Sequence, residues 1–123
     1  MGFKDTFFSK NLSINCRGNL MEFTKPKIMG ILNMTPDSFH DGGKYIETEQ
    51  MKSRVESLIK KGSDIIDLGG ISSRPGSIPV SEEEEIRRIE PALEYIRQYH
   101  PEIPVSLDTF RTEVARKMSE RYG

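Results

Sequence analysis

Polar side chains follow three apolar runs of the sequence, at the points where buried strands would end. These clusters are 33–39 (Asn-Met-Thr-Pro-Asp-Ser-Phe), 69–76 (Gly-Gly-Ile-Ser-Ser-Arg-Pro-Gly) and 106–109 (Ser-Leu-Asp-Thr). Ligands of α/β proteins bind in the loops beyond the carboxyl ends of parallel strands. We therefore expect the functional site in these three clusters.

Asn33 and Asp108 each offer a side-chain oxygen at such a strand end. The Asn33 amide could bind a cation or a substrate, or it could close the turn that follows. The Asp108 carboxylate could accept two N–H bonds from a heterocycle, or it could cap the next helix. The residues themselves leave both alternatives open.

The second loop carries residues that could approach a ligand. Gly69 and Gly70 permit a close backbone approach, and Arg74 could bind a phosphate, although these residue types are also ordinary in exposed loops. Asp64 and Asp67 stand at opposite ends of the second apolar run, so we do not expect them to form an acid–base pair. Asp67 is expected to lie just behind the residues that contact the ligand.

The other titratable residues favour structural roles. His100 is expected at a helix exit and His40 in the first loop, and neither has a partner at metal-ligand spacing. The run 82–85 of four glutamates is expected to be a solvated helix start. Cys16 is the only cysteine, which excludes an internal disulfide and a cysteine metal cluster, so we expect it to pack.

The composition favours a small-molecule role. The 123 residues include 18 Lys and Arg against 19 Asp and Glu, a net charge of -1, so no field of one sign points to nucleic acid or an anionic membrane. The N-terminal residues contain no long apolar run. We therefore expect neither a signal peptide nor a transmembrane helix, and we expect the protein in the cytoplasm.

Strands and a hairpin must position the clusters. The runs 27–33, 64–68 and 104–108 predict strands, the first of them buried on both faces. A hairpin is predicted over 12–24, where Arg-Gly-Asn at 17–19 supplies a tight turn. Repetition of strand, loop and helix indicates βα units with right-handed crossovers, and hence an α/β fold that is either an open sheet or a (β/α)8 barrel.

Three helices are predicted between and after these strands. The first begins with Thr48 as its N-cap. The second begins at Ser81, which forms a capping box with Glu84, and Pro91 is expected to bend it rather than stop it. The third covers 111–122. Apolar residues recur at helical spacing and are expected in the core: Met51, Val55, Leu58, Ile59, Ile86, Ile89, Leu93, Ile96, Val114, Ala115 and Met118.

Three ordered segments resemble the signatures of the dihydropteroate synthases. The segment 29–39, with Asp-Gly-Gly at 41–43, is similar to the first signature. The segment 62–70, which continues into Ser-Ser-Arg-Pro-Gly at 72–76, is similar to the second, and 104–109 resembles the third strand of the family. The resemblance implies a (β/α)8 TIM barrel in the parent protein.

The resemblance also implies that this chain holds only part of that barrel. Residues 1–26 would form an N-terminal segment with the β-hairpin, and 27–123 would form the first three βα units of a truncated pterin-binding domain. A complete barrel needs roughly 250 residues. We therefore expect the chain alone to be inactive and the parent enzyme, expected to be a homodimer, to be active.

The resemblance further implies an activity and a role for each matched residue. Members of the family condense 6-hydroxymethyl-7,8-dihydropterin diphosphate with p-aminobenzoate and release diphosphate, with Mg2+ bound. Asn33 would hold Mg2+, while Ser73 and Asp108 would contact the pterin substrate. Other loop residues would shape the p-aminobenzoate pocket: Thr35, Pro36, Asp37, Ser38, Phe39, Ser72, Arg74 and Pro75. The family mechanism is dissociative, so no side-chain nucleophile is expected.

Two other classes of protein remain as alternatives. A pterin-dependent methyltransferase shares the barrel and a pterin-binding carboxylate, but it would not need the loop sequences at 35–39 and 73–76. A non-catalytic binding module would follow from the truncation, because three βα units leave sheet edges and apolar faces uncovered. Methyl transfer to a corrinoid would support the first alternative, and concentration-dependent unfolding would support the second.

Overall fold

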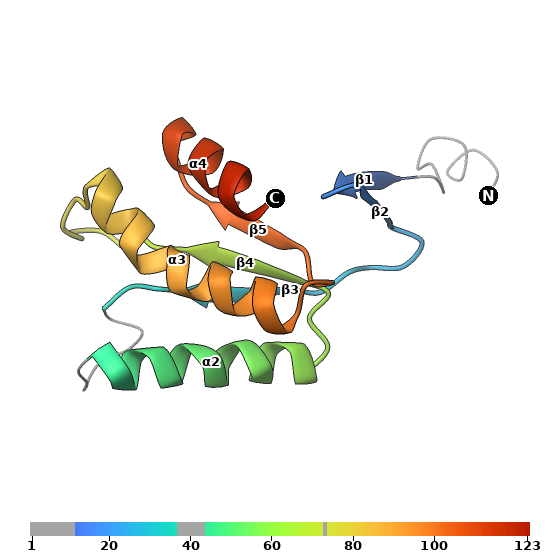
Figure 1. The fold of residues 1–123 in the computed structure, drawn as a ribbon, viewed down its shortest axis with the longest axis horizontal. Helices are drawn as coiled ribbons and strands as arrows, with labels where there is room; N and C mark the ends of the chain where they lie inside the picture. Colours follow the sequence, from blue (N-terminus) through green and yellow to red (C-terminus); the bar gives the residue numbers. More distant parts are fainter. Residues whose placement is uncertain (1–11, 37–43, 73) are drawn as a thin grey trace.

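The computed structural model describes residues 12–36, 44–72 and 74–123, which form a hairpin and three βα units (Figure 1). The strands are β1 (Ser13–Cys16), β2 (Asn19–Glu22), β3 (Met29–Asn33), β4 (Ile65–Gly69) and β5 (Val105–Asp108). The helices are α2 (Lys44–Lys60), α3 (Glu82–Tyr99) and α4 (Thr112–Tyr122). The predicted hairpin and the three strand-helix units are confirmed.

The hairpin of β1 and β2 turns at Arg17 and Gly18, as its sequence predicts. Both residues have positive φ, 53° and 81°, which a two-residue hairpin turn requires and which glycine adopts without strain. The Gly18 amide donates to the Asn15 side chain over 2.9 Å. The Arg17 side chain donates to the carbonyl of Pro101 over 3.1 Å, which ties the hairpin to the segment before β5.

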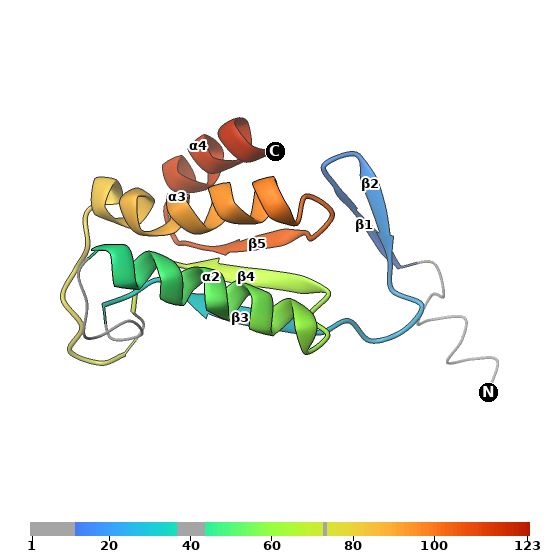
Figure 2. The same ribbon diagram turned by 60° about the horizontal axis from the view of Figure 1, so that its bottom comes forward.

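The second sheet is parallel and three-stranded, in the order β3-β4-β5. In Figure 1 the arrowheads of this sheet point away from the hairpin, so the carboxyl ends of the strands lie at the far edge. The two views show α3 running between α2 and α4 (Figure 2), and α3 contacts both helices. The core lies between these helices and one face of the sheet: Leu32, Met51, Val55, Ile66, Leu68, Ile89, Ala92, Leu93, Ile96, Val114 and Met118.

The expected burial of the first strand on both faces is wrong. Leu32 in β3 is fully buried against the helices, whereas its neighbours Met29 and Ile31 are 46% and 52% exposed. Successive side chains of a strand point to opposite faces, and the helices cover only one face of this sheet. β3 therefore has apolar side chains on both faces, although the helices of this chain bury only one of them.

Two predicted helix starts differ in outcome. α2 begins at Lys44, so Thr48 lies inside the helix and is not its N-cap. The sequence from 44 to 60 contains no glycine or proline, and nothing local stops the helix from extending backwards. The cap of α3 is confirmed, because the Ser81 hydroxyl accepts a hydrogen bond from the Glu84 amide over 3.1 Å. The Glu84 carboxylate accepts hydrogen bonds from Arg87 and Arg88 instead of closing the capping box.

Two expectations about how α3 continues and ends are confirmed, while the expected bend at Pro91 stays a prediction. The helix continues through Pro91 to Tyr99, so the proline does not stop it. His100 is the C-cap, which agrees with the expected helix exit. Within the described ranges, no helix is long and apolar enough to cross a membrane.

The one-sided cover of the sheet predicts unequal costs for truncating two neighbours in β3. Leu32→Ala should lower the free energy of unfolding of this chain by about 2–5 kcal/mol, because it leaves a cavity in the core. Ile31→Ala should cost less than about 1 kcal/mol, because that side chain is already half exposed. Urea titration of both variants measures the difference. Equal losses would mean that the Ile31 face is covered in solution.

Candidate functional site

Asn33, Gly69 and Asp108 form one row across the carboxyl ends of the three parallel strands. Asn33 is the register partner of Gly69, and Gly69 is the register partner of Asp108. A Cβ atom built on Gly69 would lie 3.7 Å from Asn33 Oδ1 and 3.6 Å from Asp108 Oδ2. The two oxygens therefore approach the same point from either side, over a residue that has no side chain.

The structure bears on both alternatives that the sequence left open. The turn after β3 is tied to the sheet by its backbone, because the Met34 amide donates to the Gly69 carbonyl over 2.7 Å. The N-cap position of α4 is Arg111, so Asp108 does not cap that helix. Asp108 is also exposed at the end of β5. Its carboxylate is thus placed at the ligand end of the sheet without a capping role.

Asp67 lies lower on the same face of the sheet. It pairs in register with Ile31 and Ser106, two residues before Gly69 along β4. The predicted place of Asp67 at the end of its strand is wrong, because β4 continues through Gly69. Asp64, just before β4, accepts a hydrogen bond from the Ile28 amide over 2.8 Å. The two carboxylates are therefore not an acid–base pair, as expected.

A cleft of about 730 Å³ lies where the first and second loops meet. The first loop contributes Thr35 and Pro36, and the second contributes Ser72. Thr35 is buried, whereas Pro36 is exposed. The rest of the lining comes from 76–81 and from Glu84 and Arg88 of α3. The structure thus brings predicted residues of both loops to one cleft beside the first turns of α3.

Several other predicted site residues are not part of this cleft. Arg74 and Pro75 are exposed on the second loop, and neither lines the cleft. Some predicted loop residues lie outside the described residues: Asp37, Ser38, Phe39, His40, the segment 41–43 and Ser73.

The second loop has internal hydrogen bonds centred on Ser72. Its hydroxyl accepts from the Arg74 amide over 3.3 Å, and its carbonyl accepts from the Ser77 hydroxyl over 3.1 Å. The Ser77 amide also donates to the Arg74 carbonyl over 3.2 Å. Gly76 has a φ of 80°, which a glycine adopts without strain. The loop is therefore a folded turn between β4 and α3.

Two guanidinium groups hold the two ends of this loop. Arg88 donates from Nη1 to the Gly70 carbonyl over 3.0 Å. Arg111 donates from Nη2 to the Val80 carbonyl. Gly70 itself packs closely on α3, because an added Cβ would lie 2.9 Å from Ile89 Cγ2. Neither arginine was predicted as part of the site, because the partners of both are carbonyls far along the chain.

Glu85 is fully buried, so the expectation of a solvated run at 82–85 is wrong for this residue. Glu85 Oε1 pairs with Arg111 Nη1 over 2.8 Å. Glu85 precedes the core residue Ile89 by four positions, and this spacing puts both side chains on the same face of α3. That spacing was the available signal, because a carboxylate on an apolar stripe needs a buried partner.

Glu84 fixes Arg88 in place. Its carboxylate accepts a hydrogen bond from Arg87 Nε over 2.8 Å and from Arg88 Nε over 2.9 Å. These two guanidinium groups hold the pKa of Glu84 at about 2, below its usual value of 4.5. Glu84 therefore stays ionised at neutral pH and keeps Arg88 oriented toward Gly70.

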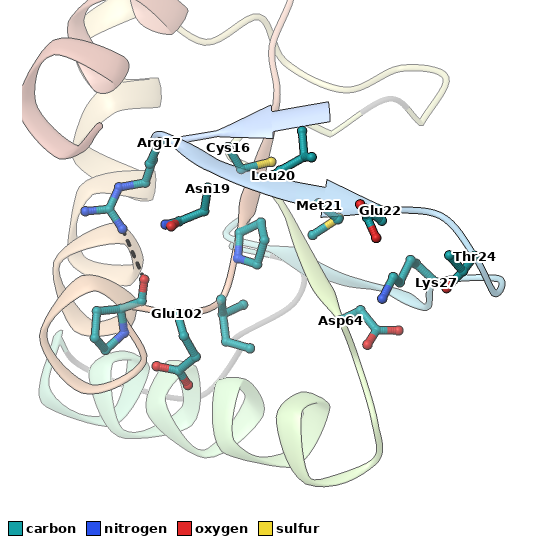
Figure 3. Close-up of a pocket in the computed structure, with 13 residues that line it drawn as sticks. Cys16, Arg17, Asn19, Leu20, Met21, Glu22, Thr24, Lys27, Asp64 and Glu102 are labelled. Atoms are coloured by element: carbon teal, nitrogen blue, oxygen red, sulfur yellow. Dashed lines mark hydrogen bonds between the residues drawn. The ribbon is translucent and has the colours of Figure 1, made fainter. Parts of the chain in front are cut away.

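A second cavity, of about 510 Å³, lies at the opposite end of the sheet (Figure 3). It is enclosed by the hairpin and by the segments that precede β3, β4 and β5. Cys16, which was expected to pack, is half-buried and lines this cavity. The Arg17 bond to the Pro101 carbonyl crosses one side of it. Of the predicted site residues that the structure describes, none lines this cavity. This end of a barrel serves stability rather than chemistry.

The site thus defines an α/β protein with a ligand-binding edge formed by parallel strand ends and the loops after them. The family profile described as pterin binding enzyme matches residues 29–123. The chain belongs to this family.

Known proteins of this family resemble the chain in sequence and in fold. The dihydropteroate synthase of Staphylococcus haemolyticus is 50% identical over 92 residues, which are 75% of this chain and 34% of that protein. A structure of the Xanthomonas albilineans dihydropteroate synthase with 4-aminobenzoic acid matches with a TM-score of 0.79 and 39% identity, over 88% of this chain and 39% of that one.

A structure of the Burkholderia cenocepacia dihydropteroate synthase complexed with 7,8-dihydropteroate matches with a TM-score of 0.74 and 32% identity, over 92% of this chain and 36% of that one. The expected fold class is confirmed: the α/β units match the N-terminal portion of these barrels, and the barrel is not closed within this chain. The chain spans about a third of the length of the curated relatives that it matches.

The pairing of Glu84 predicts an acid-sensitive contribution to stability. A carboxyl group whose pKa is lower in the folded than in the unfolded state stabilises the fold above the unfolded value and loses this effect as the pH falls. The advantage of the parent chain over Glu84→Gln should therefore shrink as the pH is lowered from about 4.5 to about 2. Urea titrations over this pH range measure it.

Glu83→Gln is the matched control, because it removes the same charge from the preceding position of α3, which is exposed. A constant difference between the parent chain and Glu84→Gln across the whole range would contradict the prediction.

Proposed function

We propose that this chain supplies part of the substrate site of a dihydropteroate synthase, which joins 6-hydroxymethyl-7,8-dihydropterin diphosphate to p-aminobenzoate. The observation that carries the proposal is the convergence of Asn33 and Asp108 over Gly69 at the ends of three parallel strands. The solved relatives with 4-aminobenzoic acid and with 7,8-dihydropteroate support the choice of substrates.

Asp108 is the proposed partner of the pterin ring. A pterin presents adjacent N–H groups along one edge, and an ionised carboxylate can accept two such bonds at once. Its exposed position at the end of β5 leaves the carboxylate accessible from the ligand side. Gly69 contributes by having no side chain, so that a flat ring can approach the sheet between Asn33 and Asp108.

Asn33 is the proposed protein ligand of Mg2+. Mg2+ prefers oxygen donors and is usually bound by one or two protein oxygens together with substrate phosphates and water, which fits the single amide oxygen that Asn33 places at the strand ends. Within the described ranges, no group of three or more His, Cys, Asp or Glu could hold a metal alone. When bound, the ion would neutralise charge on the departing diphosphate.

The cleft between the two loops is the proposed place for p-aminobenzoate. Thr35, Pro36 and Ser72 line it, and its volume of about 730 Å³ accommodates a benzoate ring. The other loop residues that match the family signatures are proposed to complete this pocket: Asp37, Ser38, Phe39, Arg74 and Pro75. Ser73 is proposed to contact the pterin substrate.

In the proposed reaction this chain positions the two substrates and supplies no nucleophile. As diphosphate leaves, positive charge develops on the pterin methylene, and the amine of p-aminobenzoate attacks it. Asp108 orients the ring, and the loop cleft holds the amine near the methylene. Because the chain spans about a third of its curated relatives, we propose that turnover also needs residues from the remaining βα units.

The first test joins this chain to the remaining barrel of its Staphylococcus haemolyticus relative, which is 50% identical over the matched region. With Mg2+ and the pterin diphosphate supplied, the joined protein should release diphosphate only when p-aminobenzoate is present. The chain alone should not release diphosphate. Absence of release by a folded joined protein would contradict the proposal, and methyl transfer to a corrinoid would favour the methyltransferase alternative.

Variants of the joined protein test the residues. Asp108→Asn should lower kcat/KM for the pterin diphosphate about 10- to 100-fold, the equivalent of a lost charged hydrogen bond. Asn33→Ala should raise the Mg2+ concentration needed for half-maximal rate. The control is Glu102→Gln, which removes one charge from an exposed residue at the opposite end of the sheet. If Asp108→Asn behaves like Glu102→Gln, the assigned role of Asp108 is wrong.

A further inference from the structure

Arg111 connects two parts of the site that are far apart in the sequence. It lies three residues after Asp108, and its amide donates to the Thr109 hydroxyl over 3.1 Å. Its guanidinium donates to the Val80 carbonyl at the end of the second loop and to the Glu85 carboxylate of α3 over 2.8 Å. One side chain therefore spans from the turn after β5 to the loop after β4.

Glu85 fixes the guanidinium in this position. The Glu85 carboxylate is fully buried and pairs with the Arg111 guanidinium. Glu85 Oε2 has no hydrogen-bond partner within the described part of the chain. A buried carboxylate that loses its cation is strongly unfavourable, so the pair has little freedom to separate. The Phe110 ring, with its centroid 4.8 Å from the Arg111 guanidinium carbon, flanks the same group.

We propose that Arg111 and Glu85 form a positioning pair that sets the second loop relative to the turn of Asp108. The inference rests on the proposed function, in which Asp108 binds the pterin and the second loop helps to hold p-aminobenzoate. Neither residue touches a substrate in this scheme. The pair acts through the Val80 carbonyl, which it holds at the point where the loop enters α3.

A second ion pair joins the same two helices and provides a matched control. Lys117 of α4 donates to Glu82 of α3 over 2.8 Å. These two side chains bind each other, and neither the Val80 carbonyl nor the turn of Asp108 is among their partners in the described part of the chain. The Lys117 and Glu82 side chains are more exposed than those of Arg111 and Glu85, so the two pairs are compared by their effect on the loop and not by their effect on stability. A purely structural role in docking α4 would lower global stability without a selective effect on the loop amides, whereas a positioning role would act on those amides.

The experiment compares two double variants, in this chain and in the joined protein. The first is Arg111→Met with Glu85→Met, which removes both charges and leaves no buried carboxylate unpaired. The second is Lys117→Met with Glu82→Met. The readouts are hydrogen exchange at the Arg74 and Ser77 amides, which are bonded inside the loop, and the KM of each substrate.

The first double variant should exchange the two loop amides about tenfold faster and should raise the KM for p-aminobenzoate about tenfold or more, with a smaller change for the pterin diphosphate. The control pair should change neither. Arg111→Lys keeps a charge for Glu85 but lacks the planar fork of donors, so it should show the same loop effect in weaker form.

Equal effects of the two double variants, or unchanged exchange in the first, would overturn the proposal. The exchange measurement does not depend on turnover. If the joined protein is inactive, the proposed function fails, while loop exchange still decides whether Arg111 and Glu85 position the loop.

Discussion

The parallel register of the three strands is the constraint on which the site depends. Because Asn33, Gly69 and Asp108 are register partners, three residues separated by many positions in the chain meet in one row. A shift of any strand by one residue would turn its side chains to the opposite face, where the helices pack. Because the three strands are parallel, the loops that follow them all begin at the same edge of the sheet. The loops that could hold a ligand therefore lie next to the row of Asn33, Gly69 and Asp108.

The packing of α3 against the end of β4 also fixes the position of the second loop. Gly70 lies against Ile89 without room for a side chain, and Arg88 holds the Gly70 carbonyl. At the other end of the loop, the Ser81 cap begins the helix and Arg111 holds the preceding carbonyl. The loop is therefore fixed at both ends by contacts with the helices, although its middle is exposed to solvent.

Local patterns predicted the elements well, and the places where they failed share a cause. The apolar runs, the turn at Gly18 and the cap at Ser81 are local signals, and the structure confirms all three. The exposure of Ile31 was not predictable, because it depends on what covers the far face of the sheet. The false N-cap at Thr48 arose because a polar residue inside a helix looks locally like a helix start.

The site shows the same division between local and distant signals. Asn33 and Asp108 were identified because each follows an apolar run, but their convergence needed the register of strands 36 or more residues apart. The spacing of Glu85 to Ile89 was a local signal of burial, but the whole run 82–85 was interpreted as solvated. Arg111 carried none, since its carbonyl partner lies 31 residues away.

The exposed middle of the second loop has an evolutionary consequence. Arg74 and Pro75 make no contribution to the buried core, and the loop is held at its ends by backbone carbonyls, which every residue possesses. Substitution of an exposed residue such as Pro75 should change the free energy of unfolding by less than about 0.5 kcal/mol. In the proposed function this loop helps to hold p-aminobenzoate, so its exposed positions can alter ligand discrimination while the buried contacts of the scaffold are kept.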